Sequence, residues 1–328
     1  SNLEFVVFIN FLLTFWIIQN IFVDEENSRI WSMQNNRVIS SQIINAYSVR
    51  TEGFVKSFSG EGNAFNSKVV DSASKEIFLN PDKYKKILLI VNESWGVTQP
   101  EIQNKLLSKL IKNKSIIDLK QGILKVNGFT IDGEVRELCR KTLSHFNLKD
   151  QQKGFENCLP NLLKSKGYYT VAMHGATGSM YDRKYWYPKA GFDNLIFRES
   201  LPRLHSRCFS FPGFCDRDLQ SQIPHIFSKH NKTFFYWLSL NTHVNYDLRD
   251  LENDDFDFEK YKLNSKMSSC RNLKLQNQFF NSLAKLVQEP ALKGTYVMIV
   301  GDHAPPIYDE SRNVFNEGEV SSLGFYVK

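Results

Sequence analysis

The 328-residue sequence lacks several features that would assign it to a simple class. It contains no Cys-x-x-Cys pair, so its five cysteines do not form a zinc-ribbon pattern. It has no internal repeat or low-complexity tract. Its net charge of +6 is spread along the chain without a basic arm, so we expect no nucleic-acid partner. The mild positive charge suits an anionic membrane surface or a phosphate-bearing substrate.

Long apolar runs are also scarce, and one run is long enough to cross a bilayer. Residues 3–23, "LEFVVFINFLLTFWIIQNIFV", have about the required length. No small-residue cleavage site follows, which disfavours a signal peptide. Two interpretations stay open. In the first, the segment is a membrane anchor or the stump of one. In the second, it is an apolar helix that is buried or docked on a surface. The polar residues within it, Glu4, Asn10, Gln19 and Asn20, argue against a clean membrane span.

The segment that follows is polar and poor in glycine and proline. We predict that residues 24–82 form a membrane-proximal helical linker, and that residues 83–328 form the main folded domain. The length of 328 residues suffices for one large domain or two small ones.

The five cysteines favour two disulfides. Cys208 and Cys215 bracket a turn-like loop, "FSFPGF", and Cys139 and Cys158 flank a polar stretch. We predict a disulfide within each pair and a free Cys270, which implies an oxidising compartment, the periplasm or the cell surface. The alternative is five reduced thiols in a cytosolic enzyme.

Apolar strand-like segments alternate with helical segments over the main domain. The strand patterns are "ILLIVNES", "YYTVAMHG", "TFFYWLSLNTHVNY", "TYVMIVGDHAPP" and "SSLGFYVK". The helical patterns are "QPEIQNKLLSKLIKN", "CLPNLLKSKG", "DLQSQIPHIFSKH" and "CRNLKLQNQFFNSLAKLVQE". This alternation predicts an α/β fold with a mostly parallel central sheet and helices on both faces.

Polar residues stand at the ends of four of these strands. Asn92-Glu93, His174, His243 and Asp302-His303 each come just after an apolar run. A single histidine in such a place is more often structural than functional. Because the carboxyl ends of parallel strands meet at one sheet edge, four coincidences predict a ligand site there.

Carboxylate and imidazole ligands suit Zn²⁺ or Mn²⁺. Glu93, Asp302 and His303 supply three ligands and leave a position open. Thr130 follows a Gly-Phe turn and precedes a helix expected from about Asp132. A helix N-terminus favours an anion, so Thr130 is a candidate nucleophile toward a phosphoryl group. The alternative is that Thr130 only caps the helix.

Five motifs in order then carry a resemblance to a known family. "VNESWG", "GFTIDGEVRELC", "HGATGSMYDRKYWYPKAGFD", "LNTHVNY" and "GDHAPP" resemble the sulfatase-like branch of the alkaline phosphatase superfamily over residues 85–328. The sequence is most similar to lipoteichoic acid synthases and phosphoethanolamine transferases. The resemblance implies an alkaline-phosphatase-like fold and makes residues 83–328 a sulfatase-like catalytic domain.

The resemblance also implies roles for individual residues. One divalent metal, Zn or Mn, would be bound by Glu93, Thr130, Asp302 and His303, and Thr130 would be phosphorylated in a ping-pong reaction. The roles implied for the remaining residues are phosphate binding by Tyr181 and Arg183, proton donation to the leaving oxygen by His243, and a pocket position for His174.

Other residues have weaker patterns. True sulfatases mature a Cys or Ser within C/S-x-P-x-R, whereas "CLPNL" has Leu162 in place of the arginine, so sulfate ester hydrolysis is disfavoured. Tyr185, Trp186 and Tyr187 fit either a substrate groove or loop packing. The acidic run "RDLENDDFDFEKYK" lacks the glycine of an EF-hand loop and is expected to be a solvated loop.

The sequence therefore predicts a metal-dependent transferase in the bacterial inner membrane, with its catalytic domain facing the periplasm or the cell exterior. It would move phosphoethanolamine or phosphoglycerol from a phospholipid to an envelope glycan or lipid through a phosphothreonine. Two alternatives stay open: a phosphodiesterase or phosphatase with the same site, and a non-catalytic binding module of the same fold.

Overall fold

The structure, a computed structural model, describes residues 56–201, 208–257, 259–264 and 266–328. Residues 61–328 form one compact unit, distinct from residues 1–60. The predicted apolar segment 3–23 and residues 24–55 of the predicted linker lie outside the described residues. Among the described helices, none combines the length and the apolar character needed to cross a membrane.

A single eight-stranded sheet forms the centre of this unit. Its order is β2-β8-β7-β1-β6-β4-β5, with β3 paired to β8. The strands are β1 (Lys86–Asn92), β2 (Gly96–Thr98), β3 (Ile116–Lys125), β4 (Tyr169–His174), β5 (Asn194–Ile196), β6 (Thr233–Leu238), β7 (Thr295–Gly301) and β8 (Phe315–Val327).

The middle of the sheet is parallel, as the sequence predicts. β7, β1, β6, β4 and β5 pair in parallel, and β6 and β7 are buried along their whole length. Strands covered on both faces have near-continuous apolar runs, which is why β7, β1, β6 and β4 were recognisable. β5, with only three residues, was not predicted. The antiparallel part consists of β8 with its partners β7, β2 and β3.

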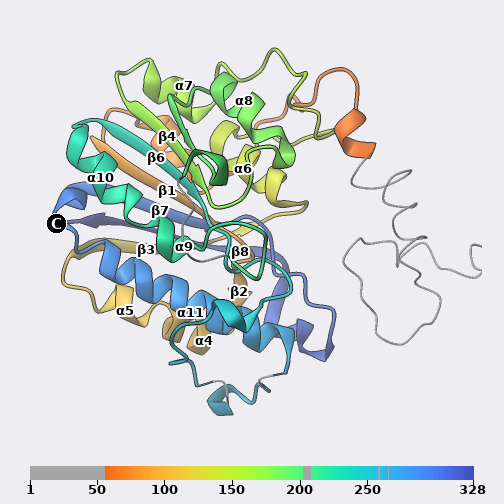
Figure 1. Cartoon of the computed structure of the whole chain (residues 1–328), viewed down its shortest axis with the longest axis vertical. Coiled ribbons are helices and arrows are strands. Elements are labelled where there is room, and N and C mark those ends of the chain that lie inside the picture. Colours follow the sequence, from red (N-terminus) through yellow and green to blue (C-terminus); the bar gives the residue numbers. More distant parts are fainter. Residues whose placement is uncertain (1–55, 202–207, 258, 265) are drawn as a thin grey trace, which may run out of the picture. The chain divides into compact units, whose positions relative to one another are not determined.

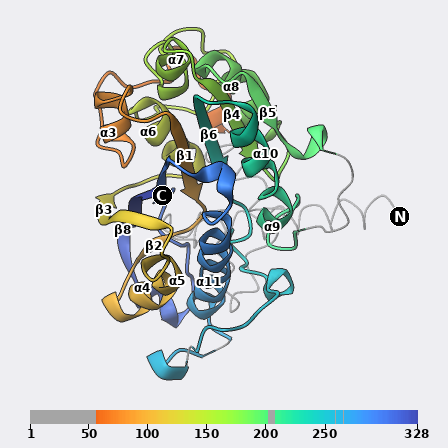
Figure 2. The same cartoon turned by 90° about the vertical axis from the view of Figure 1, so that its left-hand side faces the viewer.

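Helices cover both faces of the sheet. They are α3 (Lys75–Leu79), α4 (Pro100–Leu106), α5 (Ser108–Ile111), α6 (Thr130–Cys139), α7 (Leu159–Lys164), α8 (Arg183–Ala190), α9 (Asp216–Leu219), α10 (Gln222–Lys229) and α11 (Ser268–Leu286). Short 3₁₀ segments are Lys56–Ser59, Met180–Asp182, Arg198–Ser200, Leu248–Asp250, Glu259–Tyr261, Pro290–Leu292 and Glu310–Val314. Figure 1 shows α4, α5 and α11 grouped together, and Figure 2 shows α6 and α10 on opposite sides of β6.

Alternate strand residues define the two faces. Leu88 and Ile90 of β1 belong to the large apolar core that includes residues of α4, α5, α10 and α11. Tyr236 of β6 points to the opposite face, where its hydroxyl lies 3.4 Å from a Glu134 oxygen on α6. This two-sided burial confirms the predicted α/β class.

Several predicted elements differ in detail. The expected helix at residues 99–113 is divided into α4 and α5, and the one at 218–230 into α9 and α10. β3 was not predicted, because it is a mostly exposed edge strand in which apolar and polar residues do not alternate regularly. Residues of the predicted linker also join the compact unit: the Ser74 amide donates to Glu137 at 2.9 Å.

One predicted disulfide is present and the other is wrong. Cys139 and Cys158 are bonded and join the end of α6 to the residue before α7. Cys208 and Cys215 are free thiols, because each sulfur lies against a carboxylate oxygen of Asp250 rather than being bonded to the other sulfur. Cys270 is free and buried, as expected.

Candidate active site

The four predicted strand ends meet at one edge of the sheet. β7, β1, β6 and β4 are consecutive neighbours in the parallel region. Glu93 follows β1, Asp302-His303 follows β7, His243 follows β6, and His174 ends β4. The topology therefore brings residues more than 200 positions apart in sequence to one place, as expected for the carboxyl edge of such a sheet.

Glu93, Asp302 and His303 form a compact cluster of possible metal ligands. His303 Nε2 lies 3.4 Å from Glu93 Oε1 and 3.3 Å from Asp302 Oδ2. Thr130 Oγ1 lies 3.3 Å from Glu93 Oε2 and 3.5 Å from His303 Nε2. The four residues that we predicted as ligands thus converge on one small volume.

The cluster fits a divalent metal on its own chemistry. Asp302 is 1% exposed, and its Oδ2 has no hydrogen-bond donor among the described residues. His303 uses Nδ1 to bond the Ala304 carbonyl at 3.0 Å, which leaves Nε2 directed at the carboxylates as an acceptor. Buried carboxylates with no cation are costly, and two oxygens and one nitrogen suit Zn²⁺ or Mn²⁺.

The pKa values in the cluster reflect repulsion between the two carboxylates, Glu93 and Asp302. Burial and the neighbouring carboxylate of Glu93 raise the pKa of Asp302 to about 7. Burial opposes protonation of His303, but Asp302 and Glu93 overcome it and raise the pKa of His303. Such displaced titration is typical of functional sites.

Helix α6 carries Thr130 into the site. Phe129 is the N-cap residue and Thr130 is the first helical residue, so α6 begins before Asp132. The Thr130 hydroxyl bonds Glu93 instead of a backbone amide of its own first turn. The reading of Thr130 as a simple cap is therefore not supported by its contacts.

Two other residues of α6 join the helix to the end of β7. The Arg136 guanidinium donates to the carbonyl oxygens of Gly301 and Asp302 at 2.7 and 3.0 Å. At Gly133, an added Cβ would lie 2.8 Å from Asp302 Cα, so only glycine permits this close approach. Sequence reasoning did not identify either residue, because their partners are remote in sequence.

Arg183 is placed differently from the prediction of a phosphate-binding arginine. It is 1% exposed and forms a salt bridge with the fully buried Glu134 of α6, with Nη2 2.7 Å from Oε2. Tyr187 also donates to Glu134. One terminal nitrogen of Arg183, Nη1, has no hydrogen-bond partner among the described residues. Phosphate binding by Arg183 stays a prediction, and it would have to use this nitrogen.

The two histidines both lie near the Arg183 charge. His174 is buried, with Nδ1 3.0 Å from the Leu238 carbonyl, and burial together with Arg183 lowers the pKa of His174 well below its ordinary value. His243 Nδ1 lies 3.1 Å from the Val244 carbonyl, and burial lowers its pKa to about 4. Both rings are therefore neutral at neutral pH, and proton donation by His243 to the leaving oxygen stays a prediction.

Left-handed backbone at non-glycine residues gathers around this edge. Ser94 has φ 55°, Tyr181 and Asp182 have φ 51° and 53°, and Asn245 and Tyr246 have φ 85° and 43°. These residues follow Glu93, flank Arg183 or follow His243. Unfavourable conformations of this kind are most often retained at functional sites. The Ser94 conformation lets its amide donate to Asp302 Oδ1 at 2.8 Å.

Two of the three aromatic residues at 185–187 are structural. Trp186 and Tyr187 are fully buried packing residues, whereas Tyr185 is exposed. Asp216 accepts hydrogen bonds from the amides of Leu240 and Asn241 and so fixes the loop after β6.

A family model described as Sulfatase matches residues 85–323. The chain belongs to the sulfatase family. This confirms the resemblance drawn from the five motifs. No curated protein matches the chain.

Solved structures show the same fold at low identity. The lipoteichoic acid synthase LtaP of Listeria monocytogenes is 14% identical with a TM-score of 0.54, covering 77% of this chain and 70% of LtaP. The phosphoglycerol transferase GacH of Streptococcus pyogenes, in complex with sn-glycerol-1-phosphate, is 15% identical with a TM-score of 0.50, covering 78% and 72%. The C-terminal periplasmic domain of EptC from Escherichia coli, in complex with Zn, is 14% identical with a TM-score of 0.50, covering 82% and 78%.

Proposed function

We propose that this sulfatase-family protein transfers a phospho-alcohol group, phosphoethanolamine or phosphoglycerol, from a phospholipid to an envelope glycan or lipid. The observation that carries the proposal is the Thr130 hydroxyl, 3.3 Å from Glu93 and 3.5 Å from His303 in a cluster suited to a metal. Two of the similar structures, LtaP and GacH, are described as a lipoteichoic acid synthase and a phosphoglycerol transferase.

Glu93, Thr130, Asp302 and His303 would hold one divalent metal, Zn or Mn. When bound, the metal would favour loss of the Thr130 proton and offset negative charge on the substrate phosphate. The matching EptC structure contains Zn, which agrees with this ligand set.

In the first half of the reaction, Thr130 Oγ1 forms a bond to the phosphorus of the donor. The bond from phosphorus to the diacylglycerol oxygen breaks, and that oxygen takes up one proton in exchange for the proton that Thr130 loses, with His243 as the candidate donor. The N-terminus of α6 directs backbone N–H groups at the phosphate oxygens. The candidate side-chain donor is Arg183 Nη1. The ring centre of Tyr181 lies 4.9 Å from the Arg183 guanidinium.

In the second half, the acceptor hydroxyl forms a bond to phosphorus and the bond to Thr130 Oγ1 breaks. His243 is the candidate to accept the proton of the acceptor hydroxyl, the reverse of the proton donation proposed for it in the first half. Buried His174 lies within electrostatic reach of Arg183 and would help to shape the pocket.

We propose that the domain works at the outer face of a bacterial inner membrane, toward the periplasm or the cell exterior. The Cys139–Cys158 disulfide supports an oxidising compartment. The net charge of +6 would favour an anionic membrane surface with phospholipid donors. Sulfate ester hydrolysis is not proposed, because Cys158, which would be the matured nucleophile of "CLPNL", is bonded to Cys139.

The proposal is tested by incubating the protein with a phospholipid labelled in its head group, with and without acceptor glycan, and by intact-protein mass spectrometry. We expect a head-group phosphate adduct on Thr130 that disappears when acceptor is added. Thr130→Ala should lower transfer by at least about a thousand-fold and form no adduct. Thr142→Ala, at an exposed threonine, is the matched control and should behave as the parent protein.

The rival activity, hydrolysis at the same site, gives a different result. Product that accumulates at the same rate without acceptor would identify a phosphodiesterase. Full activity of Thr130→Ala would overturn the nucleophile assignment for both activities. Chelation of the metal should abolish activity, and readdition of Zn²⁺ or Mn²⁺ should restore it.

A further inference from the structure

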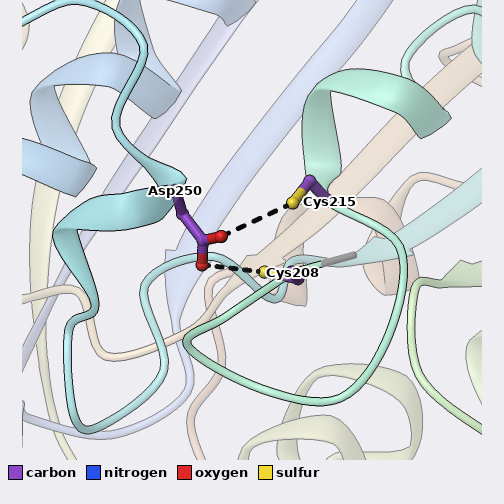
Figure 3. A group of neighbouring side chains, drawn as sticks. All are labelled: Cys208, Cys215 and Asp250. Atoms are coloured by element: carbon purple, nitrogen blue, oxygen red, sulfur yellow. Dashed lines mark hydrogen bonds between the residues drawn. The ribbon is translucent and has the colours of Figure 1, made fainter. Parts of the chain in front are cut away.

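A second group of possible metal ligands lies outside the proposed active site. It consists of Cys208, Cys215 and Asp250, and all three are buried. Figure 3 shows the two sulfurs directed at different oxygens of the Asp250 carboxylate. Cys208 Sγ lies 3.1 Å from Oδ2 and Cys215 Sγ lies 3.8 Å from Oδ1.

The Asp250 carboxylate is held firmly in this orientation. The amides of Phe209 and Ser210 donate to its two oxygens, each at 2.7 Å. The neighbouring cation, Arg249, forms its salt bridge with Asp247 rather than with Asp250. A buried carboxylate thus has two thiols beside it, and thiols are weak hydrogen-bond donors.

This arrangement differs from that of the other cysteine pair. Cys139 and Cys158 are bonded to each other, whereas Cys208 and Cys215 are separate and share a carboxylate. Zinc bonds of about 2.3 Å to sulfur and about 2.0 Å to oxygen in a tetrahedron place sulfur and oxygen ligands roughly 3.5 Å apart. The two observed sulfur–oxygen distances, each to a different Asp250 oxygen, lie on either side of that value. One ligand atom from each of the three residues lies within 4.8 Å of the other two.

We propose that Cys208, Cys215 and Asp250 bind a divalent metal of the zinc class, separate from the metal of the active site. Binding releases the two thiol protons to solvent and leaves the fourth tetrahedral position for a water molecule. Sulfur ligands select such a metal over Mg²⁺, Ca²⁺ or Mn²⁺. This proposal does not depend on the proposed function.

The metal would connect two loops that lie next to the active site. The first loop carries Phe211, whose ring centre is 4.5 Å from that of His243. The second loop runs from β6 through His243 to Asp250, and the Asp247 amide donates to Ser210 Oγ at 3.1 Å. A metal shared by both loops would hold Phe211 and His243 at a fixed separation.

Cobalt titration of the reduced full chain under anaerobic conditions tests the proposal. Co²⁺ bound by thiolates gives a sulfur-to-metal charge-transfer absorption, whereas Glu93, Asp302 and His303 contain no sulfur. We expect this absorption in the parent protein, and its loss together with about one fewer bound ion per chain in Cys208→Ser and Cys215→Ser. Asp250→Asn should bind Co²⁺ at this site at least about tenfold more weakly, with both thiols intact.

Cys270→Ser is the matched control, since Cys270 is also buried and free. It should retain the absorption and the stoichiometry. Circular dichroism in the absence of metal should show that the variants are folded. A parent protein without the thiolate absorption would overturn the proposal, and so would absorption that survives in Cys208→Ser. Thiol titration showing a Cys208–Cys215 disulfide in the protein isolated without reductant would also overturn it.

Discussion

At the scale of single residues, charge compensation explains the layout of the site. Asp302 and Glu93 face His303 and a position for a cation, whereas Glu134 faces Arg183. The second pair is fully buried, so the charge of Arg183 is already matched before any phosphate arrives. Arg183 would then orient a substrate through one remaining nitrogen rather than attract it from solution.

Glu134→Gln should destabilise the protein by roughly 3–5 kcal/mol, because it leaves the buried Arg183 charge without its carboxylate. Urea unfolding measures this difference. Lys75→Gln, which breaks the exposed ion pair with Asp71, is the matched control and should cost no more than about 1 kcal/mol. Equal effects of the two substitutions would mean that Arg183 finds another partner.

His174 should make stability depend on pH. Its folded pKa lies well below the ordinary value of 6.5, because the ring is buried near Arg183. Below about pH 6.5 the unfolded chain takes up a proton that the folded protein does not, so unfolding becomes easier as pH falls from there toward the lower folded pKa.

The measurement is the unfolding free energy between about pH 7.5 and pH 5. His174→Gln should flatten the decline, whereas His225→Gln, at an exposed position on α10, should not change it. A parent-like slope in His174→Gln would show that other groups cause the acid sensitivity.

At the scale of elements, helix α6 is the part on which the site depends most. It begins at Thr130, the proposed nucleophile, pairs with Arg183 through Glu134, and holds the end of β7 through Arg136. Gly133 allows this helix to lie directly against Asp302.

Gly133→Ala should destabilise the protein by about 1–3 kcal/mol and weaken binding of Zn²⁺, because the new methyl group would displace Asp302. Gly122→Ala on the exposed strand β3 is the control, since its Cβ would meet only the movable Ser322 hydroxyl. Isothermal titration with Zn²⁺ and urea unfolding distinguish the two. Unaltered zinc affinity in Gly133→Ala would contradict the proposed close packing.

The elements also explain what the sequence could predict. β1, β4, β6 and β7 were recognisable because strands buried on both faces have continuous apolar runs, and the polar residues at their ends followed directly. The pairing of Glu134 with Arg183 could not be predicted, because the partners are 49 residues apart and no local pattern links them. The arrangement of Cys208 and Cys215 was missed for a similar reason, since Asp250 lies on a separate loop.

At the scale of the whole molecule, one covalent link adds to the sheet and its helices. The Cys139–Cys158 bond spans 19 positions and holds the end of α6 near α7. It therefore stabilises the helix that carries Thr130 at its other end.

Reduction of this bond should lower the free energy of unfolding by about 3 kcal/mol, as expected for a closed loop of this length. The measurement is urea unfolding with and without reductant. The double variant Cys139→Ser/Cys158→Ser should be less stable and should not respond to reductant. A response in that variant would reveal a further disulfide, and Cys208 with Cys215 would be the pair to test first.

The contacts that join α6 to the end of β7 affect how this protein could acquire new substrates. Because Arg136 and Gly133 couple the helix to Asp302, displacement of Thr130 would displace Asp302 as well. The stretches around Tyr181 and Asn245 lie outside this helix, and both have unusual backbone conformations. Under the proposed function, substitutions that change head-group preference should therefore accumulate in those two loops and leave α6 unchanged.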